Sequence, residues 1–239
     1  VCRGYGGTEV LELVDVPKPA PKDDEILIKV YATTVTAADW RVRTLNVPLG
    51  FGLLARLALG ITRPRQPILG TELAGIVETI GKNVTRFKPG DAVFAFPGGK
   101  MGCHAQYRVV AENGPVALKP ENLSFEEAAS LSFGGSTALH FLRKAGLKAG
   151  DKVLVIGASG GVGTALVQLA KHFGAEVTGV TSTANLELVT SLGAARVIDY
   201  RSEDPLTQGE RYDVILDGAG GASLTALRGA LERRGTLVF

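Results

Sequence analysis

One stretch constrains the fold of this chain more than any other: residues 150–171 read GDKVLVIGASGGVGTALVQLAK. The apolar run 153–156 is typical of a buried strand, and it stops at the glycine-rich segment 157–163. Apolar residues at helical spacing follow at once in 165–170. A strand, a tight glycine turn and a helix together present unpaired backbone N–H groups and a positive helix end to a phosphate. The sequence therefore predicts dinucleotide binding at this turn.

The spacing of the glycines supports this prediction in part. Ala158 stands at the first position of the dinucleotide fingerprint, and Gly160 and Gly163 follow at the second and third. Glycines allow a sharp turn and a close approach of the backbone to the phosphates. An ordinary strand-to-helix turn of an α/β protein is the alternative interpretation of these glycines. The predicted cofactor-binding residues of the turn are Ala158, Ser159, Gly160, Gly161, Val162 and Gly163.

The rest of the chain divides into two kinds of pattern. Residues 1–119 are rich in predicted strands (26–30, 74–80 and 92–96) without helices alternating between them, which indicates a small, mostly β domain. In residues 120–239, helices alternate with short apolar runs, which indicates a parallel sheet of Rossmann type. Ser124 is the predicted N-cap of the first helix there. The predicted fold class is α/β, with strands at 152–156, 176–181, 196–199, 213–216 and 235–239.

Composition excludes several classes of protein. A net charge of +2 with 21% charged residues argues against an acidic disordered tail and against a dedicated nucleic-acid surface. Two widely separated cysteines make no disulfide framework, and no signal peptide or apolar run of spanning length is present, so we expect a cytoplasmic protein. The chain begins at Val1 and ends in the strand-like 236–239. We therefore expect a fragment in which the Rossmann domain is truncated after its fifth strand.

Segment 47–61, which reads VPLGFGLLARLALGI, is unusually apolar. A loop and helix that cover the β domain are the plainest interpretation. A hydrophobic wall over a substrate pocket is the second, and a shallow contact with a membrane surface is the third, since Arg56, Arg63 and Arg65 lie in or beside it. The segment is too short to span a bilayer.

A longer pattern surrounds the glycine turn. Gly150-Asp151, Leu154, Gln168 and Lys171 at its flanks complete a signature that resembles the quinone oxidoreductase/ζ-crystallin branch of the medium-chain dehydrogenase/reductases. Segments 70–93, 186–200 and 212–217 resemble that superfamily as well, so the similarity covers nearly the whole chain. It implies a GroES-like domain at 1–119, a Rossmann domain at 120–239, an active site in the cleft between them, and a homodimer when the chain is full length.

The resemblance also implies further site residues. Thr36 and Asp39, the latter in the segment ADWR, are the candidate catalytic residues, although a cap of a helix that begins near Trp40 is the slightly preferred interpretation of Asp39. The end of the second Rossmann strand carries no carboxylate, which favours NADPH over NADH. Arg201, or a residue of the C-terminal segment that we expect to be missing, is the candidate for the positive charge that holds the phosphate. The other candidate cofactor-binding residues are Thr137, Ser182, Thr183, Tyr200, Gly218 and Ala219.

Zinc is not expected. Thr71 stands where the zinc-dependent relatives have a histidine, and the four-cysteine structural lobe is absent. Cys103 and His104 are adjacent, but neighbouring residues of a strand point to opposite faces, so a buried thiol and an exposed ring are the simpler interpretation.

The function predicted from the sequence is a zinc-independent, NADPH-dependent reductase that transfers a hydride to a quinone or an α,β-unsaturated carbonyl. An NADP-dependent enzyme like the alcohol dehydrogenases is one alternative, weakened by the lack of a Lewis acid. A cofactor-binding protein with little turnover, acting as a redox sensor or in a structural role, is another. The glycine turn would look the same in all three.

Overall fold

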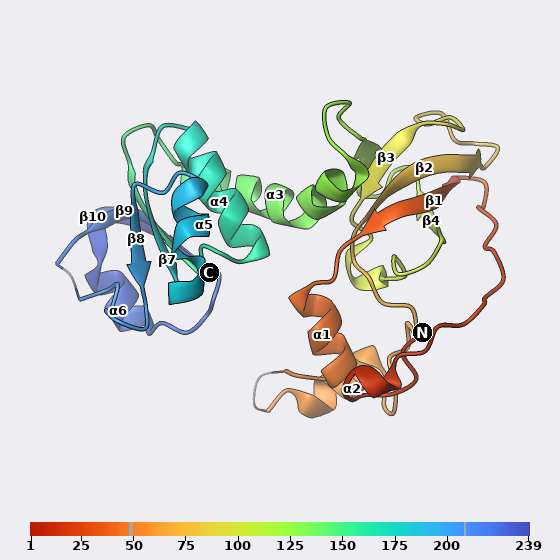
Figure 1. Cartoon of the computed structure of the whole chain (residues 1–239), viewed down its shortest axis with the longest axis horizontal. Coiled ribbons are helices and arrows are strands. Elements are labelled where there is room, and N and C mark those ends of the chain that lie inside the picture. Colours follow the sequence, from red (N-terminus) through yellow and green to blue (C-terminus); the bar gives the residue numbers. More distant parts are fainter. Residues whose placement is uncertain (48–49, 208) are drawn as a thin grey trace. The chain divides into compact units, whose positions relative to one another are not determined.

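The computed structural model describes residues 1–47, 50–207 and 209–239. The chain forms two compact units, which comprise Val1–Ser132 and Phe133–Phe239 (Figure 1). The first contains an antiparallel sheet and the second a parallel one. The α/β fold class with a β domain followed by a Rossmann-type domain is confirmed.

The boundary between the units falls inside helix α3 (Phe125–Ala145), whereas the sequence placed it after residue 119. The reason lies in the first turns of α3. Ala128 and Ala129 are buried in a cluster with Ala74 of the first unit, so this end of the helix belongs to the first core. Ser124 caps the helix as predicted, because its hydroxyl accepts a hydrogen bond from the N–H of Glu127 at 3.1 Å.

The first unit is built on a five-stranded antiparallel sheet in the order β4-β1-β2-β3-β5. Strand β1 pairs with both β2 and β4, and its residues 26–28 are fully buried. One apolar cluster that includes Ile26, Ile28, Leu73 and Val93 fills the core of this sheet. The strands are β1 (Glu25–Thr33), β2 (Leu73–Ile80), β3 (Ala92–Ala95), β4 (Tyr107–Ala111) and β5 (Val116–Leu118).

Short helical elements of this unit lie outside the sheet: η1 (Thr8–Val10), α1 (Ala37–Thr44), α2 (Gly52–Leu59) and η2 (Gly98–Lys100). Helices α1 and α2 lie near η1 at one end of the unit (Figure 1). The predicted segment 47–61 includes residues 48 and 49, which lie outside the described residues; the rest contains α2, in keeping with a loop and helix. Among the described residues no helix has both the length and the apolar character needed to cross a membrane.

The second unit is built on a parallel sheet in the order β10-β9-β6-β7-β8. Its strands are β6 (Lys152–Ile156), β7 (Glu176–Thr181), β8 (Arg196–Asp199), β9 (Tyr212–Asp217) and β10 (Leu231–Val238). The chain moves outward from β6 through β7 to β8 and then returns to the other side of β6 with β9. The strand order therefore reverses between β6 and β9, which is where ligands bind in open α/β sheets.

Three of these strands have the predicted bounds, and β10 begins earlier than predicted. The prediction started at residue 235, whereas β10 begins at Leu231, and Glu232, Arg233 and Arg234 at its start are exposed. A register shift between Leu231 and Thr236 accompanies them, so β10 pairs with β9 in two parts.

Four helical elements complete the second unit: α4 (Gly161–His172), η3 (Thr183–Asn185), α5 (Leu186–Ser191) and α6 (Leu224–Gly229). Helix α4 packs on β6 and β7 (Figure 1). Its buried residues Leu166, Val167 and Ala170 lie in one cluster with Val153 and Val155 of β6. This packing holds the first turn of α4 at the end of β6.

Candidate dinucleotide-binding site

The turn between β6 and α4 is fixed by backbone hydrogen bonds. Gly157 has a φ of +81°, a conformation that favours glycine. The N–H groups of Gly157 and Ala158 both donate to the carbonyl of Val180 in β7, at 3.1 and 2.9 Å. Gly160 N–H donates to the carbonyl of Gly157 at 3.0 Å. The turn is thus held to the neighbouring strand before any ligand binds.

Two glycines of this turn serve different purposes. A Cβ on Gly163 would lie 2.1 Å from the carbonyl oxygen of Gly157, so the helix can approach the turn only because this side chain is absent. A Cβ on Gly161 would meet no atom within 4 Å. Gly163 is therefore required for packing, whereas Gly161 leaves open space at the helix start. The sequence fingerprint predicts such a division of roles.

The start of α4 offers unpaired N–H donors. Gly160 is the N-cap, and no side chain caps the helix there. The first hydrogen bond inside the helix comes from Thr164 N–H, which donates to the carbonyl of Gly160 at 2.9 Å. The N–H groups of residues 161–163 consequently have no partner within the helix and stand at its positive end. Open space and free donors at the switch point of the sheet fit a pyrophosphate.

Ser159 joins the turn to the segment after β7. Its hydroxyl oxygen accepts hydrogen bonds from Thr181 Oγ1 at 2.8 Å and from Asn185 Nδ2 at 3.3 Å. Asn185 Nδ2 also donates to Ser182 Oγ at 3.3 Å. Thr181 is buried, while Ser182 is half-buried. Two predicted site residues, Ser159 and Ser182, are thereby brought together through Asn185, which the sequence prediction did not include.

A carboxylate lies beside the end of β7, contrary to the expectation from the sequence. Thr183 Oγ1 donates to Asp199 Oδ2 at 2.5 Å, and Arg201 N–H donates to Asp199 Oδ1 at 3.0 Å. The hydrogen bond from Thr183 and that from Arg201 hold the pKa of Asp199 below its ordinary value. Strand register explains the contact, since Thr181 pairs with Asp199 in the parallel ladder of β7 and β8. Asp199 ends β8, and its charge could not be located without that register.

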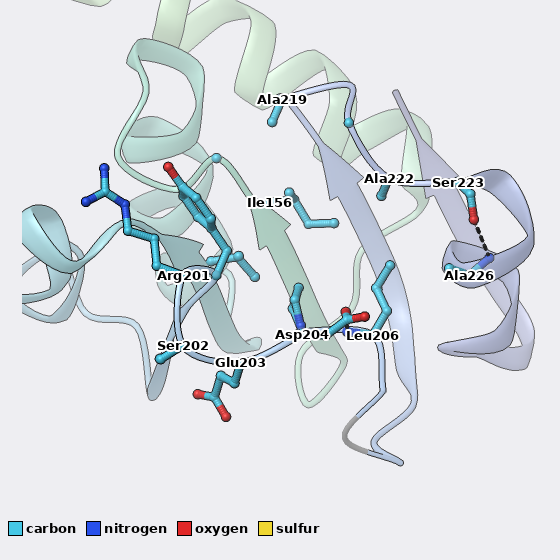
Figure 2. Close-up of a pocket in the computed structure, with 15 residues that line it drawn as sticks. Ile156, Arg201, Ser202, Glu203, Asp204, Leu206, Ala219, Ala222, Ser223 and Ala226 are labelled. Atoms are coloured by element: carbon cyan, nitrogen blue, oxygen red, sulfur yellow. Dashed lines mark hydrogen bonds between the residues drawn. The ribbon is translucent and has the colours of Figure 1, made fainter.

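A pocket of about 810 Å³ adjoins the turn within the second unit. Figure 2 shows its two walls, which are the loop after β8 and the segment from β9 to α6, with Ile156 between them. Gly157, Tyr200 and Ala219 line it, so three predicted regions meet there. The loop residues 202–206 were not predicted, because loop sequence carries no periodic signal.

The turn after β9 is stabilised by Asp217. This buried carboxylate accepts hydrogen bonds through Oδ1 from Ala219 N–H at 2.9 Å and from Gly220 N–H at 2.8 Å. Gly218 N–H donates to the carbonyl of Ile156 at 3.1 Å. The predicted contact residues Gly218 and Ala219 therefore lie beside the end of β6, but their N–H groups are already used. In any further backbone hydrogen bond with a ligand, their carbonyl oxygens would accept and the ligand would donate.

Thr137 lies in the part of α3 that belongs to the second unit and is half-buried. It stands about one helical turn after Gly134. A Cβ on Gly134 would lie 2.4 Å from the carbonyl oxygen of Gly161, which shows how closely α3 approaches the start of α4. Helical spacing thus places Thr137 near the turn, and its contact with a cofactor stays a prediction.

Thr36 and Asp39 form the start of α1 in the first unit. Asp39 Oδ2 accepts hydrogen bonds from both the N–H and the hydroxyl of Thr36, each at 2.8 Å, and Oδ1 accepts one from Gly70 N–H at 2.8 Å. Helix α1 begins at Ala37, three residues before the predicted start near Trp40, because this pair forms a capping box. Asp39 is buried. The geometry gives both residues a structural role, and a catalytic role stays a prediction.

Cys103 and His104, although adjacent in the sequence, have different surroundings. Burial raises the pKa of the Cys103 thiol to about 12, while the ring of His104 is half-buried and its Nε2 lies 2.9 Å from the carbonyl oxygen of Thr34. Within residues 1–47, 50–207 and 209–239, no group of three or more histidine, cysteine, aspartate or glutamate residues is arranged to hold a metal ion.

Comparison with known proteins agrees with this arrangement. Residues 22–121 match the family model described as alcohol dehydrogenase GroES-like domain, and residues 161–239 match the one described as zinc-binding dehydrogenase. The chain is 37% identical to a 2-methylene-furan-3-one reductase of Solanum lycopersicum over 97% of its own length and 62% of that protein. It is 35% identical to a chloroplastic quinone-oxidoreductase homolog of Spinacia oleracea, over 98% of this chain and 72% of that protein.

A solved structure gives the same result for the fold. The quinone oxidoreductase of Escherichia coli in complex with NADPH superposes with a TM-score of 0.81 and 30% sequence identity, over 98% of this chain and 70% of that one. The chain thus spans about two thirds of the length of the proteins that it matches.

Proposed function

Because this chain belongs to the quinone oxidoreductase branch of the medium-chain dehydrogenase/reductase superfamily, we propose that it reduces quinones or α,β-unsaturated carbonyls with NADPH, without zinc. The observation that carries the proposal is the open start of α4, where Gly161 leaves space and the N–H groups of 161–163 have no helical partner. The NADPH in the related Escherichia coli structure supports a nicotinamide cofactor.

The residues of the second unit fit the parts of such a cofactor. The first turn of α4 would hold the pyrophosphate through its N–H groups, with Ser159 beside it. Tyr200 and Arg201, which line the neighbouring pocket, would hold the adenosine end. When bound, NADPH supplies the hydride. The protein's contribution is then to position the cofactor and to orient the electrophile that accepts the hydride.

The first unit places a limit on this chemistry. The hydroxyl hydrogen of Thr36 is donated to Asp39, and both oxygens of Asp39 accept hydrogen bonds from the protein. While the capping box is intact, Thr36 has no hydrogen to donate to a developing oxyanion. We therefore assign this pair to holding α1 at Gly70, and stabilisation of the oxyanion must come from other donors or water.

Turnover tests the proposal directly. The chain is mixed with NADPH and with 1,4-benzoquinone, 2-cyclohexenone or a saturated ketone in parallel, with and without a zinc chelator, and NADPH oxidation is followed. We expect oxidation with the quinone or the enone, unaffected by the chelator and absent with the saturated ketone. Activity only with the ketone, or loss of activity with the chelator, would favour an enzyme like the alcohol dehydrogenases. Tight NADPH binding without oxidation by any acceptor would favour a binding protein.

The cofactor preference rests on Arg201. The Arg201 side chain is exposed and lines the pocket, and its positive charge offsets the negative charge of Asp199. We propose that it attracts the phosphate that distinguishes NADPH from NADH. Arg201→Gln should raise the KM for NADPH by about tenfold, the low end for a hydrogen bond to a charged group, and leave that for NADH unchanged. Arg228→Gln on α6 is the matched control. An equal effect on both cofactors would contradict this role.

A further inference from the structure

Helix α2 presents its apolar side chains to solvent. Leu53, Leu54 and Leu57 are 72%, 60% and 51% exposed. Their spacing places them on one face of the helix, whereas Ala55 and Leu59 lie on the opposite face and are half-buried. A helix on the surface of a globular domain normally has the reverse arrangement. The exposed leucines thus form an apolar face that the other described residues of the first unit do not cover.

The far end of α2 is attached to the first unit, which keeps this face turned outward. Tyr5 Oη donates to the carbonyl of Gly60 at 2.7 Å, and the guanidinium of Arg56 lies over the Tyr5 ring at 5.5 Å from its centroid. Arg56 Nη1 also donates to the carbonyl of Ile61 at 2.5 Å. Arg56 is therefore fixed at the edge of the apolar face, close to the point where the helix ends.

Along the sequence, the charge of the segment that contains this helix is strongly one-sided. Residues 40–71 contain five arginines and no aspartate, glutamate or lysine, a net charge of +5 within a chain whose total is +2. The ion pairs of the described residues involve none of the five. They are Arg41, Arg43, Arg56, Arg63 and Arg65. An apolar helix face within a wholly cationic segment is complementary to an interface that is apolar inside and anionic at its rim.

We propose that α2 and residues 61–65 form a peripheral binding surface for anionic phospholipid. In this arrangement Leu53, Leu54 and Leu57 enter the boundary between headgroups and acyl chains, while Arg63 and Arg65 contact the headgroups. A second copy of the chain fits this surface poorly, because two faces of the same strong positive charge would meet. An uncharged quinone or enone does not call for the arginines. The proposal stands independently of the reductase activity.

Sedimentation of the whole chain with vesicles tests the proposal. We expect binding to vesicles of phosphatidylcholine with phosphatidylserine, little binding to phosphatidylcholine alone, and loss of binding at 1 M salt, where the Debye length falls to about 3 Å. Each basic side chain near an anionic surface contributes about a fivefold increase in partitioning. Arg63→Gln with Arg65→Gln should therefore lower partitioning about 30-fold. Leu53→Asp with Leu57→Asp should abolish it.

Matched variants elsewhere make the result specific. Arg143→Gln with Lys144→Gln removes the same charge from the exposed end of α3, and Leu13→Asp with Leu188→Asp places carboxylates at two other exposed leucines. Both should bind vesicles within a factor of two to three of the unmodified chain. Equal binding to neutral and anionic vesicles, or an equal loss in control and test variants, would overturn the proposal. Self-association that the Leu53/Leu57 variant abolishes, without vesicle binding, would also overturn it and assign the face to a second copy.

Discussion

Gly163 offers the sharpest test of how the glycine turn is built. Gly163→Ala would place a methyl group 2.1 Å from the carbonyl oxygen of Gly157 and 2.8 Å from the Cα of Ala158. Ordinary contact with a Cβ begins at 3.4 Å, so the start of α4 must move away from the turn by more than about 1 Å. The neighbouring atoms are backbone and cannot rotate aside. Overpacking of this kind costs about 1–3 kcal/mol.

The matched control lies two residues earlier. Gly161→Ala adds the same methyl group in the same helical turn, where no atom lies within 4 Å, and alanine favours a helix over glycine. A change of about 1 kcal/mol in the free energy of unfolding moves the thermal unfolding midpoint of a unit of this size by about 4–8 °C. We therefore expect the midpoint of the second unit to fall by at least about 4 °C in Gly163→Ala and to stay level or rise in Gly161→Ala.

Thermal unfolding followed by circular dichroism and calorimetry measures this difference. Tryptophan fluorescence does not, because the single tryptophan, Trp40, lies in the first unit. NADPH binding adds a second readout. Gly163→Ala should weaken both folding and binding, whereas Gly161→Ala should weaken binding alone if its open space is where the pyrophosphate approaches. Equal stability of the two variants would refute the packing argument, and full NADPH affinity in Gly161→Ala would refute the assignment of the phosphate.

Two further predictions concern the first unit. Glu112 accepts hydrogen bonds from the backbone N–H groups of Arg86 and Thr85, and these lower its pKa below the ordinary value of 4.5. The ionised carboxylate therefore stabilises the fold above pH 4.5, and this contribution is lost as the pH falls further and the carboxylate is protonated. Glu112→Gln should lower the melting temperature at pH 7, and the difference from the unmodified chain should shrink below about pH 4.5; a constant difference would contradict this. Cys103 is buried with a pKa of about 12, so at pH 8 it should react with a thiol reagent only on unfolding, and fast modification of the Cys2→Ser chain would contradict its burial.

The strands of the second unit could be predicted closely because their signal is local. Lys152–Ile156 and Glu176–Thr181 are short runs dominated by buried apolar or β-branched residues, and turn residues bound them in the sequence itself. The capping box at Ser124 is equally local, since its two partners are three residues apart. In each case the residues that decide the structure are close together in the chain.

Contacts between distant segments could not be predicted in this way. Asp199 was not expected near the end of β7, because its contact with Thr183 depends on the pairing of β7 with β8. The unit boundary within α3 depends likewise on Ala128 packing against Ala74. Periodicity shows that a residue is buried or exposed but not which distant partner it meets.

Asp39 and Asp199 differ in the same way, because the contacts of Asp39 are mainly local and those of Asp199 depend on strand pairing. Asp39 was a catalytic candidate through resemblance and, alternatively, the cap of a helix that begins near Trp40. The structure gives it a capping role, but as the partner of the N-cap Thr36 one turn earlier. Asp199 carries no local signal, yet it accepts hydrogen bonds from Thr183 and Arg201, two residues of the proposed cofactor site. Charge at that point is set by Asp199 and Arg201 together. The absence of a carboxylate from the sequence after β7 is therefore insufficient to assign NADPH, and the argument for it depends on the guanidinium that opposes Asp199.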